Sequence, residues 1–141
     1  MQHDSERAAH TAQRLVAAIN AHEPEALAAL LSEAHRFVDT LGVVVCGRDN
    51  LREGWRQYFR MVPDYHIEVA RVLAEAPLVV LLGSARGTYS SDGTLQPHNA
   101  WSTPAAFRAL IHDGLVAEWQ VYADNEPVRR CMRAAAGEAS G

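Results

Sequence analysis

The sequence predicts an α+β domain in which helices cover the concave face of a curved antiparallel sheet and enclose a cavity, as in a cone. Helical patterns fill much of the first half of the chain, and strand patterns separated by turn signals fill residues 65–123. The 141 residues, 48% hydrophobic and 21% charged, suffice for one domain with a full core. A meander of four long strands under segregated helices is the arrangement that satisfies these observations.

The N-terminal segment predicts two helices that pack as a corner or hairpin. The first covers residues 5–21, and the second starts at Pro24, where a missing N–H costs nothing, and runs to about Leu31. Their apolar positions recur at helical spacing and face inward. These positions are Ala8, Ala12, Leu15, Val16, Ile19, Leu27, Leu30 and Leu31.

Two short strands and a third helix follow. We expect strands at 36–40 and 43–46 around a Leu41-Gly42 turn, and then a helix that starts at Gly47-Arg48-Asp49 and ends before Pro63. One face of this helix carries Leu51, Trp55, Tyr58, Phe59 and Val62. Gly54 costs the helix on the order of 1 kcal/mol, and such a glycine often allows close packing or leaves room for something.

The second half reads as strands over 65–75, 78–90 and 115–123. The segment 94–112 is too long for one uninterrupted strand, and its prolines 97 and 104 mark irregular points. Asp92-Gly93 and Asp113-Gly114 are hairpin signals. Gly83, Ala85 and Gly87 share one strand face, which therefore has space in front of it or a bend. A short helix over 127–136 precedes a tail, 137–141, that we expect to be disordered.

Composition argues against several classes of function. The 17 acidic and 13 basic residues give a net charge of −4 without a basic block, which disfavours nucleic acid as a partner. No secretory or transmembrane run is present, so we expect a cytoplasmic protein that is not bound to a membrane. Cys46 and Cys131, far apart in sequence, fit reduced structural thiols. The seven histidines lack metal-ligand spacing, and no nucleotide or nucleophile-elbow motif occurs, so we expect neither metal nor cofactor.

Asp39 is the most suggestive polar residue. A carboxylate at the end of a buried strand, facing an aromatic helix, has the weak solvation that a general base needs. The alternative is a turn carboxylate that accepts hydrogen bonds from the N–H groups of Thr40-Leu41-Gly42. His98 is a second candidate, either as a proton relay at a pocket rim or as a surface histidine. Asp124 either takes part in catalysis or caps the terminal helix.

Aromatic residues are the candidates for a ligand-binding wall, and core packing is the alternative for each of them. They are Trp55, Tyr58, Phe59, Trp101 and Trp119.

Four segments taken together resemble the nuclear transport factor two-like superfold, in particular its SnoaL-like and ketosteroid isomerase-like branch. They are NAHEPEALAALLSEAHRFVD (20–39), the helix start from Val45 to Leu51, HDG (112–114) and EWQVYAD (118–124). The resemblance implies a single SnoaL-like domain over residues 1–136 and a homodimer. This superfold hosts isomerases, cyclases, dehydratases, epoxide hydrolases and non-catalytic modules, so fold alone does not give function.

Carrying the family pattern onto this chain gives mixed results. Alignment of the D-x-x-G motif, Asp39 to Gly42, places Asp39 at the position of the general base of ketosteroid isomerase. The same alignment places Trp55 where a supporting aromatic residue of the pocket lies. It places Trp119 on a strand that lines the pocket. The oxyanion tyrosine and aspartate fall on Leu15 and Ala106, so a standard ketosteroid isomerase is excluded.

Two further polar residues acquire roles from the resemblance. Arg108 shares strand parity with Ala106 and could offer a cation inside the cavity, or it could face outward and pair with a carboxylate. Asp124 is nearest to the acid/base aspartate that SnoaL-like cyclases place near the end of the last strand.

We therefore expect a cofactor-independent isomerase, cyclase or dehydratase for a hydrophobic carbonyl compound, with Asp39 as general base. A non-catalytic ligand-binding or assembly module is the alternative. An epoxide hydrolase, which needs an Asp–Arg–Asp relay that Arg108 could serve, is the third possibility. An outer sheet face that includes Ile67, Val69, Leu73 and Tyr122 could form the dimer.

Overall fold

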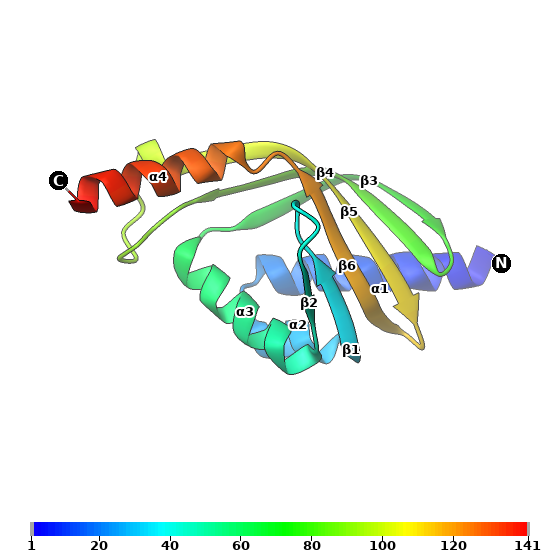
Figure 1. Ribbon diagram of the computed structural model, residues 1–141. Coiled ribbons are helices and arrows are strands. Elements are labelled where there is room, and N and C mark those ends of the chain that lie inside the picture. Colours follow the sequence, from blue (N-terminus) through cyan, green and yellow to red (C-terminus); the bar gives the residue numbers. More distant parts are fainter. Residues whose placement is uncertain (1, 141) are drawn as a thin grey trace.

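A computed structural model describes residues 2–140 and shows one curved, open sheet with helices over its concave side (Figure 1). The predicted α+β class is confirmed. Its elements are α1 (Gln2–Asn20), α2 (Pro24–Ala29), β1 (Leu31–Val38), β2 (Val44–Cys46), α3 (Arg48–Met61), β3 (His66–Glu75), β4 (Leu78–Thr88), the 3₁₀ turn η1 (Pro97–Asn99), β5 (Ala100–His112), β6 (Leu115–Ala123) and α4 (Glu126–Ser140).

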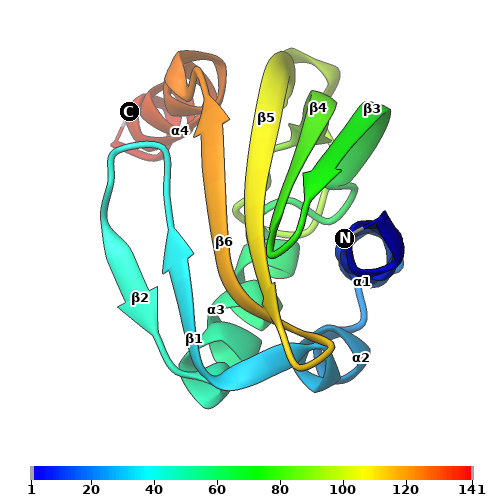
Figure 2. The ribbon, with the colours of Figure 1, turned by 90° about the vertical axis from the view of Figure 1, so that its right-hand side faces the viewer.

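The six strands lie in the order β2-β1-β6-β5-β4-β3 (Figure 2). The expected antiparallel meander is present from β3 to β6, but β1 pairs with β6 in parallel, so the sheet is mixed. A parallel pair needs a long connection, and here α3 and the strands β3 to β5 provide it. Turn signals in the sequence identify hairpins, whereas this pairing of distant segments is set by the packing of the whole sheet.

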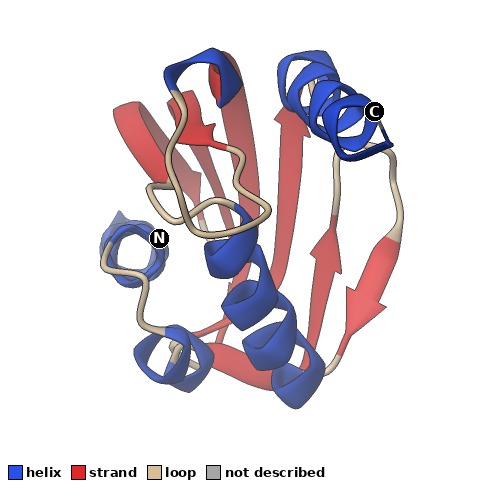
Figure 3. Ribbon diagram, turned by 90° about the vertical axis from the view of Figure 1, so that its left-hand side faces the viewer, coloured by secondary structure: helices blue, strands red, loops and turns tan. Residues whose placement is uncertain are grey.

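Helices α1, α2 and α3 supply the apolar side chains that fill the concave side of the sheet. Leu15 and Ile19 of α1 are buried, as are Leu27 of α2 and Leu51 of α3. In Figure 3 α3 runs across this face of the sheet, while α4 lies at one end of it. The predicted inward faces of these helices are therefore correct, and α3 is the helix that can close a cavity over the sheet.

An irregularity in β3 reverses which side chains face the core. The register with β4 shifts between Val69 and Arg71, as a β-bulge does. Before the shift Ile67 is 1% exposed, and after it Leu73 is 45% exposed. The expected outer face was therefore wrong for Ile67 and for Val69, which packs against the core, because simple alternation along the strand does not anticipate the bulge.

The glycines of β4 serve close packing and do not leave open space. A Cβ added to Gly83 would lie 1.9 Å from the Glu68 carbonyl oxygen, and one added to Gly87 would lie 2.3 Å from Cγ1 of Val62. Of the three small residues on this face, Ala85 has open space in front of it, because it lines the cavity described below.

Strand β5 is continuous through Pro104, contrary to the predicted interruption. Pro104 pairs with Ser84 of β4, while the pairing with β6 reaches only as far as Ala105. Proline is tolerated in a sheet where a strand is paired on one side alone. The irregular part of the predicted segment is confined to the residues before Ala100.

Element boundaries near the site also differ from the expected ones. Helix α2 ends at Ala29 and β1 already begins at Leu31, five residues before the expected start. Strand β1 ends at Val38, so Asp39 belongs to the turn. Helix α4 continues past Ala136, and residue 141 of the expected tail lies outside the described residues. None of the helices within residues 2–140 combines the length and the apolarity needed to span a bilayer.

Candidate functional site

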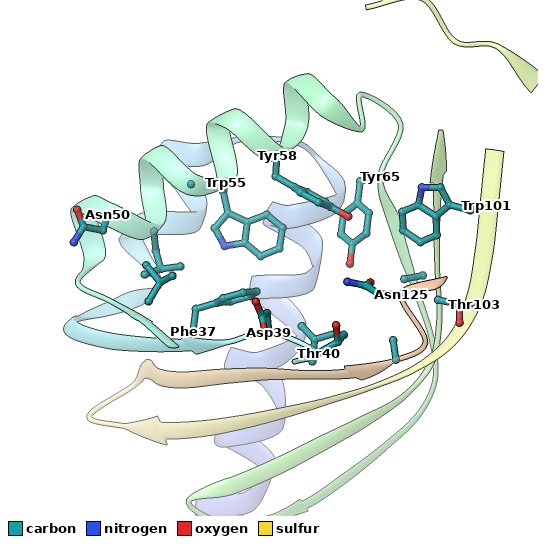
Figure 4. A pocket seen from close by; sticks show the side chains of 16 residues that line it. Phe37, Asp39, Thr40, Asn50, Trp55, Tyr58, Tyr65, Trp101, Thr103 and Asn125 are labelled. Atoms are coloured by element: carbon teal, nitrogen blue, oxygen red, sulfur yellow. The ribbon is translucent and has the colours of Figure 1, made fainter. Parts of the chain in front are cut away.

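A largely apolar cavity of about 310 Å³ lies between α3 and the concave face of the sheet (Figure 4). Asp39 is the one charged residue among those that line it. The lining residues are Phe37, Asp39, Thr40, Val45, Asn50, Leu51, Gly54, Trp55, Tyr58, Tyr65, Ala85, Trp101, Thr103, Val121, Ala123 and Asn125. Such a composition, apolar walls with a few polar groups, is typical of small-molecule sites.

Asp39 lines the cavity and also closes the turn between β1 and β2. Its Oδ1 accepts hydrogen bonds from the backbone N–H groups of Leu41, at 2.8 Å, and Val43, at 2.9 Å. Its Oδ2 accepts no hydrogen bond from the part of the chain that the structure describes. The two alternatives that the sequence left open for this residue are therefore compatible in space, because one oxygen holds the turn and the other remains available.

Four aromatic rings form a continuous wall along the cavity. Tyr58 lies edge-on to Trp55 and to Tyr65, with ring centroids 5.9 Å and 5.1 Å apart. Tyr65 also contacts Trp101, at 6.1 Å between centroids. These separations are those of favourable aromatic pairs, so the wall is held by ring–ring packing as well as by burial.

The phenols of Tyr58 and Tyr65 are further candidate polar groups at the cavity. The sequence indicated the ring of Tyr58 as part of an aromatic wall, but it indicated neither hydroxyl as a hydrogen-bond donor. Burial raises the pKa of both hydroxyls, which keeps them neutral and able to donate. Within residues 2–140 neither hydroxyl makes a hydrogen bond, and Figure 4 shows that of Tyr65 directed toward Asn125. Only the fold could reveal these donors, because Tyr65 is distant in sequence from Asp39.

Two further polar atoms of cavity residues are buried without a partner in the described part of the chain. They are Oγ1 of Thr40 and Nε1 of Trp101. Unsatisfied buried groups cost free energy and are a feature of sites that are completed by a ligand. The adjacency of Thr40 to Asp39 was the only signal in the sequence that could have pointed to the first of them.

The other predicted aromatic residues lie outside the cavity lining. Phe59 stacks on His22, with ring centroids 4.7 Å apart. Trp119 is 1% exposed and stacks on Phe107 at 5.2 Å. Of the five aromatic candidates, the structure thus brings Trp55, Tyr58 and Trp101 to the cavity.

The remaining polar candidates are not brought to Asp39. His98 is exposed in η1. Asp124 is exposed, and its Oδ1 accepts a hydrogen bond from the N–H of Glu126, the first residue of α4, at 2.9 Å. Capping, the alternative given above for Asp124, is therefore the arrangement present.

Arg108 lies on the outer face of the sheet, contrary to the expected placement inside the cavity. Its guanidinium pairs with Glu118, whose other oxygen accepts a hydrogen bond from Arg36 at 2.9 Å. Phe107 takes the inward position on β5 and is 1% exposed. The other alternative, an outward arginine paired with a carboxylate, is thus the one present, because the alignment on Ala106 assigned the wrong face of β5.

Metal-ligating residues do not gather in the described part of the chain. Over residues 2–140 no three side chains of His, Cys, Asp or Glu lie close enough together to hold a metal ion.

Comparison with known proteins places this architecture in a family. A family model described as a SnoaL-like domain matches residues 12–119. No curated protein matches the sequence.

Solved structures share the fold at low sequence identity. A Catenulispora acidiphila protein with a ketosteroid isomerase-like fold, in complex with trimethylamine, has a TM-score of 0.69 at 18% identity over 79% of this chain and 83% of that one. A protein from Shewanella denitrificans described as a SnoaL-like polyketide cyclase gives 0.76 at 14% identity over 89% and 96%. An epoxide hydrolase of M. tuberculosis, described as LEH-like, gives 0.75 at 12% identity over 96% and 97%. On the match to the family model, this chain belongs to the SnoaL-like domain family.

Proposed function

We propose that this chain is a cofactor-independent proton-transfer enzyme for a hydrophobic carbonyl compound, with Asp39 as general base. The observation that carries the proposal is the position of Asp39, the single charged residue in an otherwise largely apolar cavity. Its Oδ2, which no donor of residues 2–140 occupies, is available to take a proton from a bound substrate.

The Tyr58 and Tyr65 phenols support this proposal as donors to the carbonyl oxygen. Leu15 and Ala106, which align with the oxyanion residues of ketosteroid isomerase, supply no donor, and Leu15 is buried in the core. A neutral phenol in a water-poor cavity stabilises developing negative charge on oxygen. Tyr65 is 6% exposed, which fits such an environment.

The proposed step balances without a co-reactant. Oδ2 of Asp39 takes the proton from the carbon next to the carbonyl, and the C–H electron pair forms the enolate, whose oxygen accepts a hydrogen bond from a phenol. Return of the proton to another carbon completes an isomerisation. Attack of the enolate carbon on a second carbonyl, whose oxygen takes the proton back from Asp39, gives cyclisation. Departure of a β-hydroxyl group with that same proton, as water, gives dehydration.

Proton–deuterium exchange tests the base directly. A panel of hydrophobic enolisable ketones is incubated in heavy water, and NMR follows exchange at the carbon next to the carbonyl. We expect exchange with wild type and loss of it with Asp39→Asn, and retention with Asp124→Asn, a carboxylate outside the cavity lining. Equal exchange by wild type and Asp39→Asn would reject Asp39 as the base.

A non-catalytic binding module for small amines is the second candidate. The aromatic wall together with one carboxylate suits a methylated ammonium group through cation–π attraction, and a structural neighbour is described in complex with trimethylamine. Calorimetric titration with trimethylamine hydrochloride, combined with no ketone exchange, would favour this candidate. The epoxide hydrolase alternative lacks support, since none of the cavity-lining residues is an arginine that could link two carboxylates.

A further inference from the structure

Gly54 is a costly residue for which the fold itself gives no reason. It lies in the middle of α3, where glycine is less favourable than alanine. Its φ is not in the left-handed region, and a Cβ added to it would meet nothing within 4 Å. Gly83 and Gly87 are different, because a Cβ at either position would collide with a neighbour. Close packing, one of the two explanations that the sequence allowed for Gly54, is therefore excluded.

The position of Gly54 supports the other explanation, which is that the missing side chain leaves room at the cavity. Asn50, Gly54 and Tyr58 follow one another at intervals of four residues, so they lie along one flank of α3, and all three line the cavity. Gly54 is itself exposed, which places it where the cavity opens to solvent. A side chain at this point would stand in open space between its two neighbours on the rim.

We propose that Gly54 is a specificity-determining residue that keeps this rim open, so that ligands of more than one ring fit against α3. The cavity thereby gains width at the expense of helix stability. This inference rests on the proposed function in one respect, that the cavity is the ligand site. It does not require Asp39 to act as a general base.

Substitutions of graded size at position 54 separate the effect of Gly54 on helix stability from its effect on the width of the cavity. Gly54→Ala and Gly54→Leu both introduce good helix formers, and Gln57→Leu is the matched control, because Gln57 is exposed on α3 and does not line the cavity. The probes are cyclohexanone and 2-decalone, a one-ring and a two-ring ketone. Quenching of the fluorescence of Trp55 and Trp101 reports their binding.

We expect Gly54→Ala to raise the midpoint of thermal unfolding by about 3 °C. We expect Gly54→Leu to weaken 2-decalone binding about tenfold while cyclohexanone binding changes much less, and Gln57→Leu to bind both probes as wild type does. Lower thermal stability of Gly54→Ala, equal 2-decalone affinity of Gly54→Leu and wild type, or no 2-decalone binding by wild type would each overturn the proposal. Size-dependent binding without ketone exchange would leave it standing and reject the Asp39 mechanism alone.

Discussion

Oδ1 of Asp39 accepts a hydrogen bond from the backbone N–H of Val43 at 2.9 Å, so a side chain that lines the cavity also holds the turn beside it. Asparagine retains an acceptor at this position, whereas alanine removes it. We expect Asp39→Asn to keep the stability of wild type within about 0.5 kcal/mol and Asp39→Ala to lose about 1 kcal/mol. Urea denaturation measures both values. A large loss with Asp39→Asn would mean that the turn needs the charge.

The cavity phenols give a second prediction. Because neither hydroxyl has a partner within residues 2–140, Tyr65→Phe and Tyr58→Phe should leave the stability nearly unchanged. Loss of a donor to the enolate oxygen should slow ketone exchange by about tenfold or more for at least one of the two variants. Measurement of the exchange rates and unfolding midpoints of both variants tests this prediction. Unaltered exchange in both variants would exclude the phenols as donors to the enolate oxygen.

Alkaline titration checks the state of these phenols. Burial raises the pKa of Tyr58 and Tyr65 above that of an unfolded tyrosine, about 10, so the unfolded chain releases these protons first as the pH rises. Stability should therefore fall above pH 10, and phenolate absorbance from two of the four tyrosines should emerge together with unfolding. Reversible ionisation of all four in the folded protein would contradict the burial.

His35 predicts a loss of stability toward acid pH. It is 1% exposed, its Nδ1–H donates to the Val116 carbonyl at 2.6 Å, and burial lowers its pKa. Below pH 6.5 the histidine of the unfolded chain binds a proton that His35 of the folded chain does not bind. The free energy of unfolding therefore falls by up to about 1.4 kcal/mol per pH unit. Denaturation of wild type and His35→Gln between pH 5 and 7.5 should show the steeper dependence in wild type. Parallel curves would exclude His35 as the source.

Arg108 tests whether the structure or the family alignment gives the correct position for this side chain, outside or inside the cavity. Since its guanidinium is paired with Glu118 outside the cavity lining, Arg108→Met should leave ketone exchange within about twofold of wild type. The loss of stability should stay below about 1 kcal/mol, because the arginine is part-exposed. A strong loss of exchange with unchanged unfolding would restore Arg108 as a ligand-binding residue.

We also expect two copies of the chain to associate through the outer sheet face. Leu82 and Tyr122 are exposed and both pair with Ala106, one from each side, which makes an apolar row across three strands. Light scattering at micromolar concentration should give a dimer for wild type and a monomer for Tyr122→Glu. A monomeric wild type would exclude this assembly.

Local sequence patterns predicted the elements but not how distant ones meet. The helical spacing of Leu51 and Trp55 and the hairpin signal at Asp113-Gly114 identify α3 and the β5–β6 turn, because both depend on neighbours in the chain. The parallel pairing of β1 with β6 and the bulge in β3 depend on contacts across the sheet. A single extra residue in β3 exchanges its inner and outer faces, which is why Ile67 was misplaced.

The sequence by itself determined the class of fold, the position of Asp39 beside the Leu41-Gly42 turn and the aromatic face of α3, since these follow from periodicity and turn chemistry. Only the tertiary structure decided which groups share the cavity with Asp39. It brought Tyr65 and Trp101 there, buried Trp119 in the core and turned Arg108 outward. The physical reason is that the curvature and register of the sheet, which no local segment encodes, set the direction in which each of these side chains points.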